Sequence, residues 1–258
     1  MITGMLLAAM PQAHAAMGTS ADEIMNCSDQ ATKVVGALSD LTLTLIDSSG
    51  QQRVRQLSMA TKLEPNGHDN MRLLRFISPA DIKGTVTLLI EHGGQSDDMW
   101  IYLPALKKTR RLVADNKRDS FVGSDLTFGD LIGHQPSDWA NTNLREEVID
   151  GKPTWVIESS PRNAMIKTSS GYSKRLLWVE KQSCIPLRTD YWDDAGLSLK
   201  TVRTSRVEGM DVANKKYQFM HLEASNQQTG HKSILNYNKY TLSQKIDDSV
   251  FAPRSLDQ

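Results

Sequence analysis

Apolar and polar residues alternate along much of the chain, and this pattern predicts a protein built mainly of β-strands. Residues 41–45 have the sequence LTLTL, which places three leucines on one face of a strand and two threonines on the other. Turn sequences such as 47–50 (DSSG), Asp150-Gly151 and Ala195-Gly196 favour hairpins between the alternating runs. The predicted strands cover residues 41–45, 54–63, 71–77, 85–90, 99–103, 155–159, 173–179, 185–192, 197–207, 218–225 and 233–242.

Two regions depart from this pattern and predict helices. The first begins after Thr19 or Ser20, either of which can cap it, with acidic residues in its first turn. Its apolar residues recur at helical spacing: Ile24, Cys27, Ala31, Val34, Val35 and Leu38, with Gly36 near the end. The second region is helical or irregular over 125–132 and 137–147, and Ser124 or Asp125 is the expected cap of the helix that starts at Leu126.

The order of these elements argues against a doubly wound parallel sheet, because strands and helices do not alternate. A meander of about ten antiparallel strands must bury one face. It can close on itself, pair with a second sheet, or curl around its few helices. A curved sheet with helices over its concave side often leaves an apolar cavity.

The first fifteen residues predict an export signal. Residues 2–10 are apolar, Pro11 ends the run, and Ala13-His14-Ala15 matches a cleavage site. The segment lacks the usual Lys or Arg before the apolar run, so a disordered tail or a late start is the alternative. The run is too short to span a membrane. We therefore expect a signal peptide at 1–15, a single domain at 16–258, and a soluble periplasmic protein.

Composition argues against nucleic acid as a partner. Lys and Arg together number 30, equal to Asp and Glu, so the chain lacks the basic excess usual in nucleic-acid-binding proteins. The two cysteines, Cys27 and Cys184, either form a disulfide or are isolated core residues. The second alternative is slightly favoured, because the sequence does not show that their elements meet.

Catalytic and metal-binding motifs are absent from the sequence. The histidines lack metal-ligand spacing, and Ser124 is not in a nucleophile elbow, because Asp125 and Leu126 follow it. We expect no cofactor. A basic cluster after the strand at 99–103 has two interpretations: a solvated hairpin, or a surface for an anionic head group, a membrane or an acidic partner. Its members are Lys107, Lys108, Arg110 and Arg111.

The central block resembles the outer-membrane lipoprotein-sorting proteins, the LolA-like family related to LolB and RseB. The resemblance is carried by residues 100–106 (WIYLPAL), by Arg110-Arg111 and by 120–131 (SFVGSDLTFGDL), with weaker matches from about 20 to 255. The family-motif residues are Pro104, Phe121, Gly123, Ser124, Asp125 and Asp130. The resemblance implies an α+β fold of mostly β structure, in which an incomplete barrel is closed by helices over an apolar cavity. It carries over no catalytic residue, and the two cysteines are not part of the family pattern.

The resemblance implies a periplasmic carrier or chaperone that holds a lipid, or the acyl chains of a lipoprotein, beside an RND-type transporter. Its partners would be an inner-membrane transporter or an outer-membrane acceptor, with peripheral membrane contact. We expect the cavity to be lined by Leu41, Leu43, Leu45, Leu88, Ile90, Trp100 and Tyr102, with Lys107, Lys108, Arg110 and Arg111 at its rim or at a docking face. The alternatives are an envelope sensor or adaptor of the same fold and a hydrolase that uses Ser124 or a carboxylate.

Overall fold

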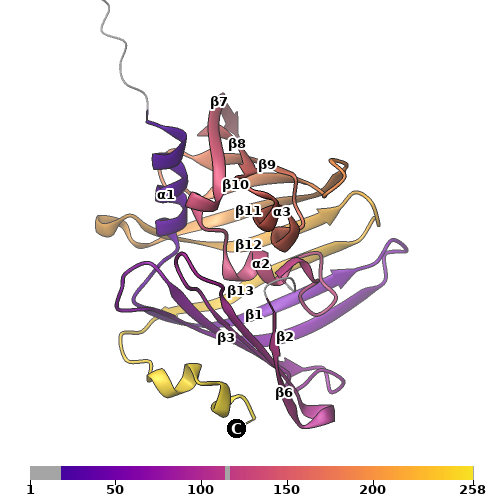
Figure 1. Cartoon of the computed structure of the whole chain (residues 1–258). Helices are drawn as coiled ribbons and strands as arrows, with labels where there is room; N and C mark the ends of the chain where they lie inside the picture. Colours follow the sequence, from indigo (N-terminus) through magenta and orange to yellow (C-terminus); the bar gives the residue numbers. More distant parts are fainter. Residues whose placement is uncertain (1–18, 114–116, 258) are drawn as a thin grey trace, which may run out of the picture.

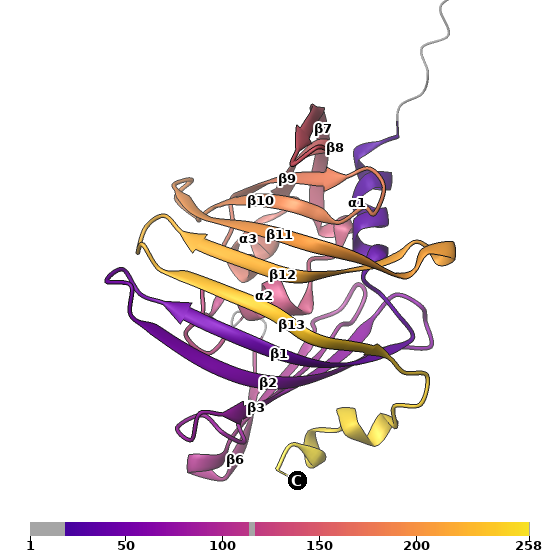
Figure 2. The same cartoon turned by 180° about the vertical axis from the view of Figure 1, so that it is seen from behind.

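One large antiparallel sheet forms most of the molecule in the computed structural model, which describes residues 19–113 and 117–257. Its thirteen strands follow the order β6-β5-β4-β3-β2-β1-β13-β12-β11-β10-β9-β8-β7. The sheet curves strongly and does not close into a barrel (Figures 1 and 2), which confirms the predicted fold class. The predicted signal peptide at 1–15 lies outside the described residues.

The sheet consists of two meanders joined by their first and last strands. The first contains β1 (Gly36–Ile46), β2 (Gln52–Leu63), β3 (Asn70–Ser78), β4 (Val86–Ile90), β5 (Asp98–Leu103) and β6 (Lys108–Leu112). The second contains β7 (Trp139–Ile149), β8 (Lys152–Pro161), β9 (Lys174–Glu180), β10 (Pro186–Trp192), β11 (Ser198–Asp211), β12 (Lys216–Asn226) and β13 (Lys232–Leu242). Strands β1 and β13 pair along nearly their full length, with Leu43 opposite Leu235.

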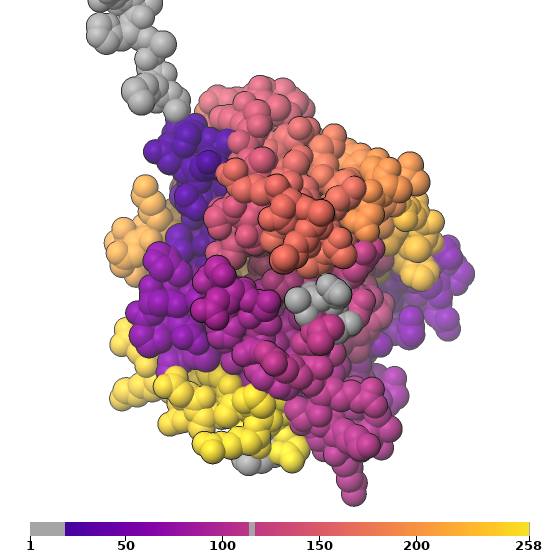
Figure 3. Space-filling view, viewed as in Figure 1, coloured from indigo at the N-terminus to yellow at the C-terminus, as the bar shows by residue number. Residues whose placement is uncertain are grey.

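Side-chain alternation gives the sheet an inner and an outer face, both partly covered. We call the face that packs on α2 (Phe128–Ile132) the inner face. On β3, for example, Leu74 belongs to the inner core, whereas Leu73 belongs to a separate cluster with Phe251. That outer cluster lies under the C-terminal segment, whose short turns are η5 (Asp248–Phe251) and η6 (Pro253–Ser255), shown in yellow in Figures 1 to 3.

The first helix, α1 (Ala21–Ala31), is shorter than the sequence suggests. Ser20 caps it as expected, since its hydroxyl accepts from the Glu23 amide while the Glu23 carboxylate accepts from the Ser20 amide. The helix ends at Ala31, and the predicted continuation to Leu38 is wrong because β1 begins at Gly36. Gly36 is required there, since a side chain would lie 2.4 Å from the Ser243 carbonyl oxygen.

A second correction concerns residues 137–147, which were expected to be helical or irregular. This segment is the edge strand β7, preceded by a short turn, η3 (Pro136–Asp138). An edge strand that is solvated on both sides needs no alternation of apolar residues, so β7 has no period of two. The elements that were not predicted include β6, the helix α3 (Ala164–Ser170) and the turn η1 (Pro104–Leu106) at the tip of the β5–β6 hairpin. The remaining turn, η4 (Val212–Asn214), connects β11 to β12.

The two cysteines form a disulfide, which corrects the slight preference for isolated residues. Cys27 on α1 is bonded to Cys184 in the turn between β9 and β10, 157 positions along the chain. The cluster around them includes Ile24, Ile157 and Ile185. The bond therefore fixes the N-terminal helix to the second meander. Among the helices of the described residues, none has the length and apolar character needed to cross a membrane.

Candidate functional site

A cavity of about 290 Å³ lies between the inner face of the sheet, α1 and the segment that carries α2. Its volume is near the lower end of the range usual for small-molecule sites. Both meanders contribute to its wall, Met59 and Leu74 from the first and Val202, Leu222 and Leu235 from the second. These side chains point inward from alternate positions of their strands, so the floor of the cavity is apolar.

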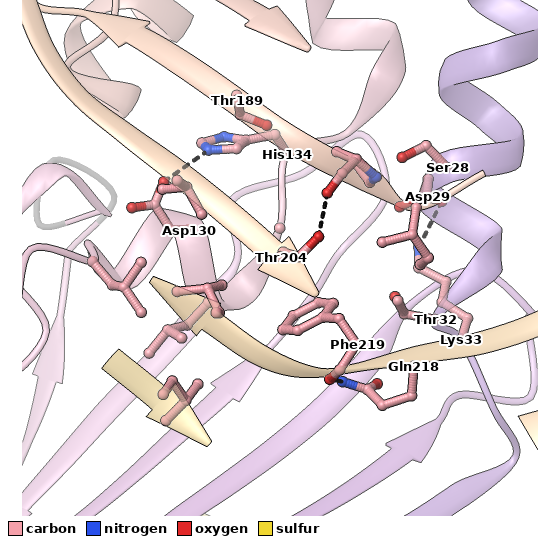
Figure 4. A pocket seen from close by; sticks show the side chains of 18 of the residues that line it. Ser28, Asp29, Thr32, Lys33, Asp130, His134, Thr189, Thr204, Gln218 and Phe219 are labelled. Carbon is pink, nitrogen blue, oxygen red and sulfur yellow. Dashed lines mark hydrogen bonds and ion pairs between the residues drawn. The ribbon is translucent and has the colours of Figure 1, made fainter. Parts of the chain in front are cut away.

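The C-terminal end of α1 lies at this cavity through Ser28, Asp29, Thr32 and Lys33, which Figure 4 shows on one side of the pocket. Lys33 is buried and forms ion pairs with Asp29 at 2.8 Å and with Glu91 at 3.4 Å. Glu91, which directly follows β4, also binds Arg72 of β3 at 2.7 Å. This network joins the helix to the first meander, while the disulfide joins it to the second.

A second charged cluster is centred on Asp130 of α2. The Asp130 carboxylate binds Lys200 of β11 at 2.5 Å and accepts hydrogen bonds from the Tyr172 hydroxyl at 2.9 and 3.1 Å. Burial alone would raise the pKa of Asp130, but the Lys200 ammonium and the neighbouring His134 hold it well below its usual range. Asp130 is therefore ionised and fully paired at neutral pH.

His134 lies beside this cluster, with Nε2 3.5 Å from an Asp130 oxygen (Figure 4). Burial, together with the positive charge of Arg175, lowers the pKa of His134 to about 4. The imidazole is therefore neutral at pH 7. Its ring packs edge-on against Trp139 and Tyr172 at centroid distances of 5.5 and 5.9 Å.

Arg175 on β9 is the remaining charged group of the cavity wall. Only 4% of the residue is exposed, and its guanidinium stacks on the Trp139 ring with Cζ 3.7 Å from the centroid. Burial lowers its pKa, but an arginine remains charged in proteins. Sequence reasoning missed this residue. The available signal was its position, since Arg175 shares its strand face with Leu177 and Val179 in the alternation of 173–179.

Three of the predicted lining residues are on the expected face but not at the cavity. Leu41, Leu43 and Leu45 point to the inner side of β1, where they are buried in the main core with Phe76 and Phe121. That part of the concave side is filled by the segment before α2. The described cavity lies beyond it, under α1.

The other four predicted lining residues are on the wrong face. Leu88, Ile90, Trp100 and Tyr102 belong to the outer cluster with Phe251 and do not line the cavity. The C-terminal segment covers the outer face of β3 to β5, so both faces of these strands are apolar. The alternation then no longer distinguishes inside from outside.

The basic cluster does not form a rim of the cavity. Lys107, Lys108, Arg110 and Arg111 are exposed on the β5–β6 hairpin, whose tip projects at the lower edge of the molecule (Figures 1 and 3). Arg111 binds Asp98 and lies over the Trp100 ring. The prediction of rim residues is therefore wrong, and their use as a docking face stays a prediction.

The family-motif residues are structural, with one exception. Pro104 begins η1, and Phe121 stacks on Phe76 in the core. Gly123 has a positive φ of 76°, and Asp125 accepts a hydrogen bond from the Ser233 hydroxyl at 2.7 Å. Asp130 is the one motif residue at the cavity.

Neither Ser124 nor Asp125 caps α2. The cap is Thr127, whose hydroxyl accepts from the Asp130 amide, while the Ser124 hydroxyl bonds within its own turn to Leu126. The prediction of the cap was wrong because the helix begins two residues later than Leu126. Within the residues that the structure describes, no group of His, Cys, Asp and Glu side chains could hold a metal ion.

Solved structures of similar fold connect this architecture to known proteins. A candidate outer membrane lipoprotein-sorting protein domain from Vibrio parahaemolyticus matches with a TM-score of 0.84 and 25% identity, over 92% of this chain and 98% of that one. A DUF1329 family protein from Desulfovibrio piger matches with a TM-score of 0.83 and 25% identity, over 92% and 97%. A model of a family described as "-like: Uncharacterized protein" matches residues 68–258. The chain belongs to this family, and its fold is LolA-like.

A more distant LolA superfamily protein from Nitrosomonas europaea shows the same fold, with a TM-score of 0.68 and 18% identity over 90% of this chain and 97% of that one. No curated protein matches this sequence. The LolA-like resemblance predicted from residues 99–131 is therefore confirmed for the fold of almost the whole described chain.

Proposed function

We propose that this LolA-like protein is a periplasmic carrier that holds the acyl chains of a lipid or a lipoprotein in the cavity under α1. The observation that carries the proposal is the cavity itself, whose apolar floor lies beneath a helix joined to both meanders. The similarity to lipoprotein-sorting domains supports it. The disulfide favours an oxidising compartment such as the periplasm.

Burial of the acyl chain would provide the binding energy. Each buried CH₂ group contributes about 0.8 kcal/mol, so some ten methylenes give gross energy on the order of 8 kcal/mol before ordering costs. Release into an acceptor membrane then requires a change of shape or a partner. Movement of α1 would open the cavity, because its residues Met25, Ser28 and Asp29 form part of the wall.

A cavity-filling substitution tests the proposal. Leu222→Trp on the floor of the cavity should abolish binding of a fluorescent acyl probe and slow lipid transfer between vesicles. The matched control is Leu197→Trp, because Leu197 is 63% exposed in the β10–β11 turn. If Leu222→Trp folds and binds the probe as tightly as the wild type, the cavity is not the acyl site.

The basic hairpin is proposed as the face that meets an anionic membrane surface. Lys107, Lys108 and Arg110 are exposed, and cations near a membrane contribute about 1 kcal/mol each in attraction to anionic lipid. Replacing the three by Gln should reduce co-sedimentation with phosphatidylserine vesicles and leave acyl-probe binding unchanged. The same substitutions would have no effect on sedimentation if the cluster only keeps the edge strand β6 from pairing with other chains.

Partnership with an RND-type transporter is part of the proposal and rests on the family resemblance. Cross-linking in the native host followed by mass spectrometry would test it. A stable protein complex without lipid transfer between vesicles would instead support the alternative, an envelope adaptor of the same fold.

A further inference from the structure

The inner face of the second meander carries a row of polar side chains that cross the strands at one level. The register places Ser159 of β8 opposite Arg175 of β9, Arg175 opposite Tyr191 of β10, and Tyr191 opposite Lys200 of β11. All four side chains are buried. The row therefore contains two buried cations, Arg175 and Lys200, two strands apart.

The two cations have different surroundings. Lys200 is fully satisfied, with Asp130 at 2.5 Å and the Asp125 carbonyl oxygen at 2.8 Å. The Arg175 side chain has neither an ion pair nor a hydrogen bond with any part of the chain that the structure describes, and its Nε is buried without a partner. Arg175 is also one of the residues that line the cavity.

The acidic residues of the cavity wall are already paired with other cations. Asp29 binds Lys33, Glu91 binds Arg72 and Lys33, and Asp130 binds Lys200. His134 is neutral at pH 7. Within the described residues, Arg175 is therefore the cation of this wall without a paired acid.

A buried guanidinium without acceptors destabilises the folded protein unless a ligand in the cavity binds it. A buried charge loses its hydration, and a guanidinium has five N–H donors that need acceptors. The Trp139 ring under the guanidinium supplies no acceptor for the N–H donors at the edge of that group. That edge is complementary to a carboxylate or a phosphate, each of which can accept two parallel hydrogen bonds.

We propose that the cavity selects an amphiphile with an anionic head group, whose carboxylate or phosphate oxygens bind Arg175 while its acyl chain lies on the apolar floor. This inference rests on the proposed carrier function and adds the chemistry of the ligand. Both a free fatty acid and a phospholipid supply such oxygens, and a neutral lipid does not.

Competition against a fluorescent acyl probe tests the inference on the intact disulfide-bonded protein, with dodecanoate, dodecyl phosphate and dodecanol as ligands of equal chain length. The wild type should bind dodecanoate or dodecyl phosphate at least about tenfold more tightly than dodecanol. The tighter of the two anions identifies the source of the head group. This comparison needs no variant and holds even if a substitution prevents folding.

Arg175→Met keeps much of the apolar stem and removes the charge, so it should bring the affinities for dodecanoate and dodecanol within about twofold of each other. The matched control is Arg188→Met on the outer face of β10. Arg188 also lies over a tryptophan, Trp178, at 4.6 Å, but it is paired with Asp190 at 2.7 Å. This variant should retain the wild-type preference.

The outcomes separate this inference from the carrier function. If dodecanol binds as tightly as both anions, selection of an anionic head group is refuted. If Arg175→Met retains the preference, Arg175 is refuted as the group that binds the head group. In both cases the carrier function stands. If the protein binds neither the probe nor any of the three amphiphiles, the proposed carrier function fails, and this inference fails with it.

Discussion

Removal of the disulfide should strongly destabilise the protein. Cys27 and Cys184 are separated by 157 positions, so the bond closes a loop that contains more than half of the chain. Cross-linking a loop of this length lowers the entropy of the unfolded chain by an amount worth about 5 kcal/mol at 25 °C. The free energy of unfolding of the double variant Cys27→Ala/Cys184→Ala should therefore be lower than that of the wild type by up to about 5 kcal/mol.

Urea denaturation followed by circular dichroism measures this loss. A 5 kcal/mol change would lower the midpoint by roughly 2 M for a slope of about 2–3 kcal/mol per M. Reductant should shift the wild type to the curve of the double variant and leave the variant itself unchanged. Equal midpoints for the oxidised wild type and the double variant would refute the reasoning.

Asp130→Asn should lower the free energy of unfolding measured by calorimetry by about 3–5 kcal/mol, because it leaves the buried Lys200 charge unpaired. Adding Lys200→Met should restore most of this stability, and a further loss in the double variant would contradict the reasoning. His134 has a folded pKa of about 4, below its ordinary value, so its contribution to stability is complete above about pH 6.5 and falls by roughly 3 kcal/mol as the pH drops to 4. In His134→Gln the pH dependence of urea midpoints over that window should be flatter, and an unchanged profile would argue against a buried neutral imidazole. Phe251→Ala should lower the free energy of unfolding by about 3–5 kcal/mol and make Trp100 more accessible to fluorescence quenchers, because Phe251 packs in the outer cluster. A variant with the stability and the quenching of the wild type would show that the C-terminal segment is dispensable.

The sequence predicted strands well where one face of the sheet is buried and the other is solvated. Residues 41–45 alternate because the leucines enter the inner core, and β1 indeed contains them. The edge strand β7 could not be recognised in this way. This segment is a strand because it pairs with β8, and the local sequence pattern does not indicate that pairing.

The site was harder to predict than the fold, for two physical reasons. Leu88 and Trp100 were assigned to the cavity because they are apolar, but the C-terminal segment buries the outer face of their strands, and no local pattern indicates this. Lys33 and Arg175 were missed because a charged residue is normally solvated. Their burial depends on contacts with Glu91, which follows β4, and with Trp139 of β7, and only the folded chain brings these residues together.

The pairing of β1 with β13 determines when the cavity comes into existence during folding. Each meander can form from contacts between neighbouring strands, but the pairing between them joins residues about 200 positions apart, such as Leu43 and Leu235. Contacts of such separation form slowly, because a long loop must close first. The wall of the cavity takes Met59 and Arg72 from one meander and Tyr191 and Phe219 from the other. Binding of the acyl probe by the proposed carrier during refolding would therefore report this slow long-range step, and a chain that lacks β13 would hold two partial sheets and no complete cavity.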